Sequence, residues 1–162
     1  MRTNERFLVV AITFFLSESL WGISLPMKID STFRQMYPNE LSVDWQQKEG
    51  YYVAEFIKGG SEFVVWFNDM TAEWVMTEEN IDSLSQIPIA VIKAFHRYFI
   101  GGMKLKEITL ITFKNHQTAY AFAIGLYNSD ESYQLIYFSN GTLYKEFDTT
   151  QLGEEIYPEL FE

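Results

Sequence analysis

The pattern of apolar and polar positions along the chain predicts two amphipathic helices. In the stretch 87–99, apolar residues recur at i, i+3, i+4 and i+7, which is the spacing of one buried helix face. Pro88 suits the first turn of this helix. The stretch 25–37 has the same pattern 62 positions earlier, with Pro26 in the place of Pro88 and Phe33 in the place of Phe95. The chain is therefore predicted to contain two copies of one unit.

Each predicted helix is followed by segments with the alternation and the β-branched and aromatic content of strands. The first copy has these segments at 41–46, 51–58, 62–67 and 74–77, and the second at 107–114, 118–127, 132–138 and 142–147. Gly59-Gly60 and Asn140-Gly141 are predicted hairpin turns, and both residues of Asn140-Gly141 accept the positive φ of a tight type I′ turn. Residues 78–86 are predicted to be a polar connector.

These elements predict an α+β fold made of a tandem repeat, with one helix and a four-stranded antiparallel meander in each copy. Two copies side by side would form one antiparallel sheet of about eight strands with both helices on one face. We place the first copy at 25–79 and the second at 80–148. The remainder, 149–162, is an acidic tail, and its last ten residues are expected to be loosely held.

The N-terminal segment resembles a secretory signal peptide. Arg2 and Arg6 precede an apolar run of about ten residues, which is too short to span a membrane, where roughly twenty are needed. Small residues at Ser17 and Ser19 favour cleavage after residue 19, and a cut after residue 22 is nearly as plausible. We therefore expect a periplasmic or secreted protein with no stable membrane insertion after cleavage.

The formal net charge of −10 and the absence of cysteine narrow the function classes further. An acidic surface repels nucleic acid, which we do not expect as a partner. Without cysteine there is no disulfide framework and no thiolate chemistry.

A search for catalytic and cofactor-binding patterns favours a non-enzyme. His96 and His116 are the only histidines, and neither has another ligand at metal spacing, so we expect no metal and no cofactor. The serines lack a nucleophile elbow, and the glycine pairs lack the context of a phosphate loop. Carboxylates are so numerous that a close pair by itself has little value as evidence for glycosidase chemistry.

The order and spacing of several short strings resemble the PepSY-like family, also described as β-lactamase-inhibitor-protein-like. The strings are Phe33 to Pro38, Val43 to Trp45, Tyr51 to Phe56, Val65 to Phe67, Trp74 to Glu78 and Tyr137 to Gly141. This resemblance implies an exported, repeat-built, non-enzymatic protein of the bacterial envelope. One departure is the turn at 68–73, where Met70 and Thr71 stand in place of the expected glycine.

A binding surface is predicted on the sheet face away from the helices. If Phe63, Val65 and Phe67 face the helices, with Ile136 and Phe138 as their repeat equivalents, then the neighbouring residues point the other way. The candidate binding residues are Trp66, Tyr137, Val64, Leu135 and Val53. Trp66 and Tyr137 would project from this open face, and Trp66→Ala would change binding much more than stability. The alternatives are that the face assignment is inverted or that loops and the tail cover the surface.

Two functions of different classes remain open. The first is a binding module that engages a protein partner, which the family resemblance suggests is a hydrolase. The second is a small-ligand carrier or sensor with an apolar cleft between the two copies. The sequence indicates neither the partner nor the oligomeric state.

Overall fold

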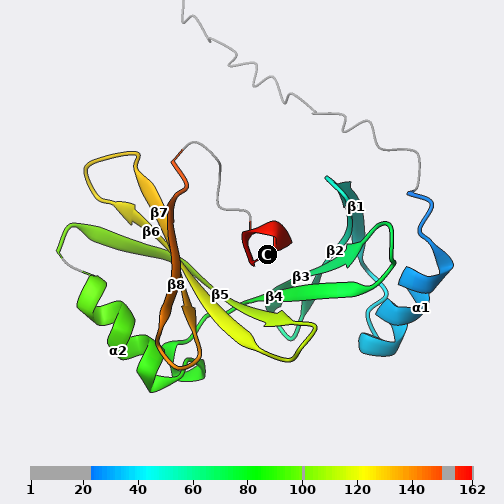
Figure 1. Cartoon of the computed structure of the whole chain (residues 1–162), viewed down its shortest axis with the longest axis horizontal. Coiled ribbons are helices and arrows are strands. Elements are labelled where there is room, and N and C mark those ends of the chain that lie inside the picture. Colours follow the sequence, from blue (N-terminus) through cyan, green and yellow to red (C-terminus); the bar gives the residue numbers. More distant parts are fainter. Residues whose placement is uncertain (1–22, 100, 151–155, 162) are drawn as a thin grey trace, which may run out of the picture.

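The computed structural model describes residues 23–99, 101–150 and 156–161, which form two helices and one eight-stranded antiparallel sheet (Figure 1). The sheet is a meander, since each strand pairs with the next in chain order. The elements are α1 (Met27–Met36), β1 (Asp44–Lys48), β2 (Tyr51–Lys58), β3 (Ser61–Asn68), β4 (Trp74–Asn80), η1 (Leu84–Gln86), α2 (Ile89–Tyr98), β5 (Met103–Phe113), β6 (Thr118–Leu126), β7 (Ser132–Phe138), β8 (Leu143–Asp148) and η2 (Pro158–Phe161). The predicted α+β fold is confirmed.

The two helices have matching ends and matching buried faces. Pro26, with φ −58° and ψ 134°, and Pro88, with φ −55° and ψ 137°, are their N-caps. Ile29 and Phe33 are buried on α1, and the equivalent residues of α2 are buried as well. Phe33 packs edge-on against Trp45 and Phe56. The repeat spacing of 62 therefore corresponds to equivalent packing.

Both helices cover the same face of the sheet. Directly paired residues of adjacent strands point to one face. The face away from the helices can be followed from β3 to β7 through directly paired residues: Trp66 with Met76, Met76 with Phe113, and Ala119 with Phe138. We call this other surface the helix-free face. In Figure 1 the helices lie at opposite ends of the sheet, and η2 lies between β8 and the strands of the first half.

Two strands extend beyond their predicted bounds. β4 continues to Asn80, so the connector before α2 is shorter than predicted, and β5 begins at Met103 instead of Glu107. Asn80 pairs with Thr109, and the Ile81 N–H donates to Ile108 O at 2.8 Å. Backbone pairing between the two halves thus holds a polar segment in the sheet despite its weak strand propensity.

Two turns differ from the conformations expected from the sequence. Only Gly141 of the Asn140-Gly141 pair has a positive φ, 83°, so the turn is not type I′. The Gly141 N–H donates to Phe138 O, which is typical of a three-residue loop ending in a left-handed glycine. At 68–73, Ala72 takes the left-handed conformation, and Asn68 Oδ1 accepts the N–H groups of Met70 and Thr71.

The predicted signal segment, 1–19 with a cut as late as 22, lies outside the described residues. Within the described ranges, no helix has the length and apolar character needed to cross a membrane.

We predict that Phe33→Ala and Phe95→Ala each lower the free energy of unfolding by about 3 to 5 kcal/mol, because each removes a buried ring. Denaturant unfolding of the purified chain measures this. Met27→Ala and Ile89→Ala are matched controls, since both side chains are exposed on the same helices and should shift stability by less than about 0.5 kcal/mol. Wild-type stability for either phenylalanine variant would contradict the paired-helix core.

Candidate functional site

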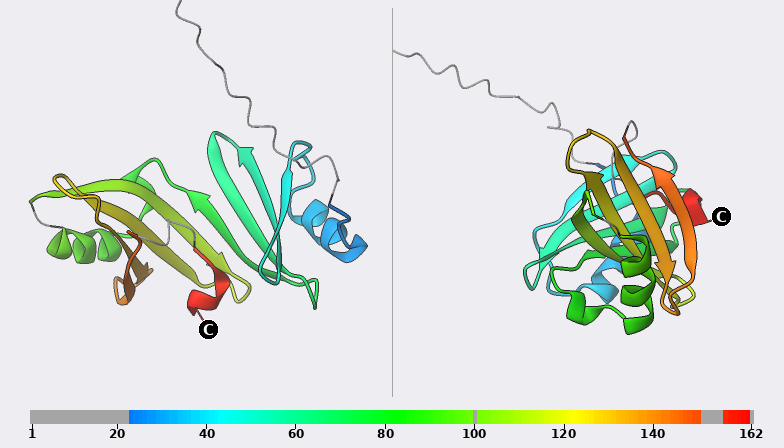
Figure 2. Two further views of the ribbon diagram at one scale, coloured as in Figure 1. Left: turned by 90° about the horizontal axis from the view of Figure 1, so that it is seen from above. Right: turned by 90° about the vertical axis from the view of Figure 1, so that its left-hand side faces the viewer.

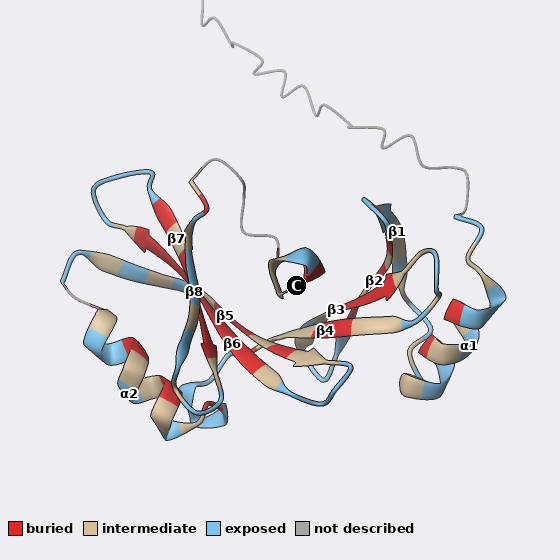
Figure 3. Cartoon of the chain, in the orientation of Figure 1, coloured by how far each residue is buried: buried red, intermediate tan, exposed pale blue. Residues whose placement is uncertain are grey.

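The helix-free face also carries a buried apolar cluster. Its buried residues come from both halves of the chain and form one cluster: Tyr51, Val53, Trp66, Met76, Ile111, Ala119, Ala121, Ile136 and Ile156. The last of these belongs to the C-terminal segment rather than to the sheet. Figure 3 shows buried residues along the central strands on either side of η2.

Residues 156–161, which we call the C-terminal segment, cover part of this face. Ile156 is buried in the cluster, and the Tyr157 ring lies 5.4 Å from the Trp66 ring. The Tyr144 hydroxyl donates to Leu160 O at 3.2 Å. Figure 2 shows η2 against the sheet, next to strands of the second half. The expectation of a loosely held tail is therefore wrong for these six residues.

Three of the five candidate binding residues lie on the helix-free face. Trp66 is only 2% exposed and Val53 is fully buried, while Val64 is half-buried. The indole N–H of Trp66 donates to Glu78 Oε1 at 2.6 Å, so its polar atom has a partner within the sheet. The prediction that Trp66 projects from an open surface is wrong, because the C-terminal segment packs over it.

The other two candidates, Leu135 and Tyr137, lie on the opposite face. Both are buried in the cluster beneath α2, and they pair directly with Phe122 and Tyr120. The prediction took Phe138 as the repeat equivalent of Phe67, an offset of 71 positions. It therefore assigned Ile136 and Phe138 to the helix side. The structural equivalent of Phe67 is Tyr137, because both follow a register shift at the same place in β3 and β7. A one-residue slip exchanges the two faces of a strand.

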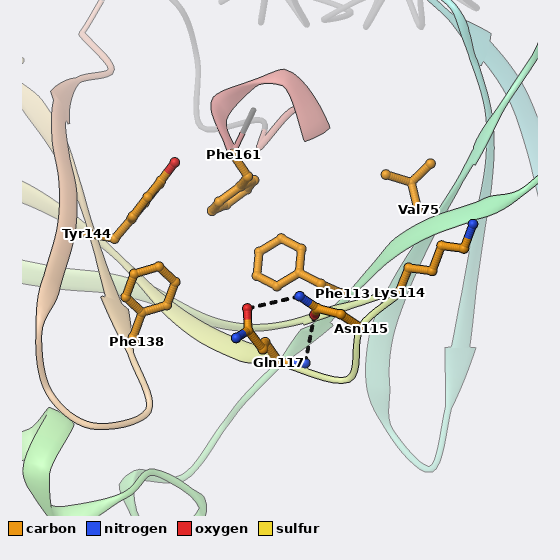
Figure 4. A pocket seen from close by; sticks show the side chains of 8 residues that line it. All are labelled: Val75, Phe113, Lys114, Asn115, Gln117, Phe138, Tyr144 and Phe161. Carbon is orange, nitrogen blue, oxygen red and sulfur yellow. Dashed lines mark hydrogen bonds between the residues drawn. The ribbon is translucent and has the colours of Figure 1, made fainter.

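An open groove lies on the helix-free face beside the C-terminal segment (Figure 4). The groove has a volume of about 510 Å³ and runs from the start of β4 across the end of β5 to β8. Its lining residues are Val75, Phe113, Lys114, Asn115, Gln117, Phe138, Tyr144 and Phe161. This set combines aromatic walls with an amide-bearing rim.

The aromatic walls of the groove are held by contacts with one another. The Phe161 ring lies 4.7 Å from the Phe113 ring and stacks on Tyr144 at 5.6 Å. Tyr144 also meets the Phe138 ring edge-on at 5.0 Å. Such contacts add to area burial and fix ring orientation, so the groove has a defined apolar wall before any partner binds.

The rim of the groove is polar and locally ordered. In the turn from β5 to β6, Asn115 Oδ1 accepts the Gln117 N–H, and Asn115 Nδ2 donates to Gln117 Oε1. Lys114 Nζ lies 2.7 Å from a Glu73 carboxylate oxygen, and this contact lowers the pKa of Glu73. A second hollow of about 490 Å³ shares Gln117 and Phe138 with the groove. The rim can thus offer amide donors and acceptors to an extended segment.

The groove is lined mainly by aromatic and amide side chains. Across 23–99, 101–150 and 156–161, no group of three or more potential ligands could hold a metal ion. His116 lies in the second hollow and has a left-handed φ of 62°, and His96 lies on α2. The arrangement suits recognition of apolar and aromatic groups bordered by hydrogen-bonding groups.

Sequence reasoning missed the groove residues Phe113, Tyr144 and Phe161. Phe113 and Tyr144 lie in predicted strands, but Phe161 lies in the segment predicted to be a loose tail, and it is Phe161 that joins the two rings. Gln134 indicated that the predicted face of β7 was inverted. With Ile136 and Phe138 on the helix side, this polar residue would also face the helices, where an apolar residue is expected. It lies instead on the helix-free side, and its Oε1 is buried without a hydrogen-bond partner.

Solved structures of Bacteroides proteins are similar to this chain along most of its length. A DUF2874 family protein from Bacteroides ovatus has 32% identity and a TM-score of 0.78, covering 86% of this chain and 99% of its own. A protein from Bacteroides eggerthii, provisionally described as periplasmic, has 29% identity and a TM-score of 0.71, with 77% and 89% covered. A BLIP-like protein from Bacteroides fragilis has 28% identity and a TM-score of 0.70, with 83% and 94% covered. The sequence matches no family model and no curated protein.

We predict that Trp66→Ala lowers the free energy of unfolding by about 3 to 5 kcal/mol, because it removes a buried indole and leaves Glu78 without that donor. Met70→Ala is the control, since this side chain is 91% exposed near the end of the same hairpin. Equilibrium unfolding in urea measures both. A loss below about 1 kcal/mol for Trp66→Ala would indicate an exposed indole instead.

Proposed function

This chain belongs to the DUF2874 family and is similar to a BLIP-like protein, and from that premise we propose that it is an exported, non-enzymatic module that binds a protein partner through the groove. The partner class that the BLIP-like resemblance suggests is a hydrolase. The family alone does not determine the partner, because one fold supports many functions.

Export is supported by two independent observations. The N-terminal segment has the basic, apolar and small-residue order of a signal peptide. A relative of similar fold is provisionally described as periplasmic. A non-enzymatic role is supported by the BLIP-like relative and by the aromatic and amide composition of the groove.

The observation that carries the protein-partner proposal is the form of the groove. It is an open trough about 510 Å³ in volume, and strands from both halves and the C-terminal segment contribute to it. Clustered aromatic side chains with a polar rim are typical of the centre of a protein interface. A small-ligand carrier would instead enclose most of its ligand's surface in a cleft between the halves.

The charge of the chain supports a partner with a basic surface around its contact region. The formal net charge is −10. Opposite charge accelerates the encounter of two proteins and selects against acidic partners. The association rate should therefore fall as salt is added.

We predict that the wild-type chain, residues 20–162, captures a partner from envelope extract and that a Phe138→Ala, Tyr144→Ala double variant does not. Both rings line the groove, and both are partly buried, so folding of the variant is first checked by circular dichroism. The loss is expected because aromatic anchors dominate binding energy.

The matched control is a Leu143→Ala, Met70→Ala double variant. Both side chains are exposed and lie outside the groove lining. Capture by the wild type and the control, with loss in the groove variant, would support the proposal. Equal capture by all three chains would place the contact elsewhere, and no capture by the wild type would count against a protein partner.

A further inference from the structure

A smaller cavity, separate from the groove and from the second hollow, lies on the helix side of the second half. It has a volume of about 190 Å³ and lies between α2, η1 and the strands β5 and β6. Its lining residues are Leu84, Ile92, Phe95, His96, Phe99, Leu105 and Phe122. It shares no residue with the groove, so the two sites can be tested separately.

The floor of this cavity is aromatic and its walls are aliphatic. The Phe95 and Phe122 rings stack at 4.2 Å with 14° between their planes, and Phe99 lies 5.1 Å from Phe95. Ile92 and Leu105 close the sides. His96 is the only lining residue with a polar side chain, and it is exposed, so it borders solvent rather than the floor.

The mouth of the cavity is formed by a segment with few ties to the rest of the fold. Leu84 is 44% exposed at the start of η1. The hydrogen bonds of this turn join residues 83–87 to one another: Ser85 N–H to Ser83 Oγ, and Ile87 N–H to Leu84 O. Leu84 can therefore shift without breaking a hydrogen bond to the sheet.

The size and chemistry of the cavity select one class of ligand. A volume of about 190 Å³ is below the range of roughly 300 to 1,000 Å³ for drug-sized ligands. Apolar cavities of about 150 Å³ lined by leucine, isoleucine and phenylalanine exclude water and take up single-ring hydrocarbons. A charged group would lose its hydration there without gaining a partner.

We propose that this cavity is a binding site for a small, uncharged molecule that carries one apolar ring. The ring lies on the Phe95 and Phe122 floor, and any single polar substituent points to the His96 end. The site does not depend on the groove or on a protein partner.

Toluene is the probe, and titration of the isotope-labelled chain followed by amide and methyl chemical shifts is the measurement. We expect saturable shifts confined to α2, η1 and the facing parts of β5 and β6. The dissociation constant should be on the order of 1 mM, because the burial of one apolar ring supplies little more binding free energy than this. Ile92→Trp should fill the cavity and raise this constant at least tenfold. Ile89→Trp is the matched control, because Ile89 is 65% exposed on the same helix and outside the lining.

Leu84→Trp fills the cavity from its mouth and replaces Ile92→Trp if that variant does not fold. Saturable shifts that both the wild type and Ile89→Trp show, and that the filled variant loses, would support the site. The proposal is overturned if toluene produces no saturable shift, if the shifts lie at the groove, or if the filled variant binds as the wild type does.

Discussion

The sheet is apolar on both of its faces, and this constraint governs the rest of the structure. Central strands such as β6, where seven consecutive residues from Ala119 to Gly125 are buried, need cover on each side. The helices cover one face and residues 156–161 cover part of the other. Because apolar area left in water costs about 25 cal/mol per Å², the C-terminal segment belongs to the core rather than to the surface.

Residues 156–161 cover the helix-free face unevenly, and the groove lies where their cover is incomplete. Over the first half, Ile156 is buried in the same cluster as Trp66, and the Tyr157 ring lies against the Trp66 ring. Over the second half, Phe161 reaches Phe113 and Tyr144 but leaves the trough beside them. The same segment thus closes one surface and forms a wall of another.

Much of the fold was predictable because the repeat appears in local patterns. The helix spacing of 62, the proline N-caps and the bounds of β2 and β7 follow from residues close together in sequence. The face of β7 was assigned wrongly because Leu135, Ile136 and Tyr137 are all apolar and show no alternation, so that Gln134 was the one residue in this part of the strand that indicated its direction. The groove was not predictable either, because it depends on where the C-terminal segment returns to the sheet. Its aromatic residues are far apart in sequence and carry no motif.

The central claim is that the reachable apolar surface is the groove and not the Trp66 region. The most direct test is line broadening by a soluble, uncharged paramagnetic agent in NMR spectra of the purified chain. The account predicts strong broadening of Phe138 and Tyr144 ring signals and almost none of the Trp66 indole N–H, which is buried and bonded to Glu78. Broadening of the Trp66 indole equal to that of Tyr144 would contradict the account.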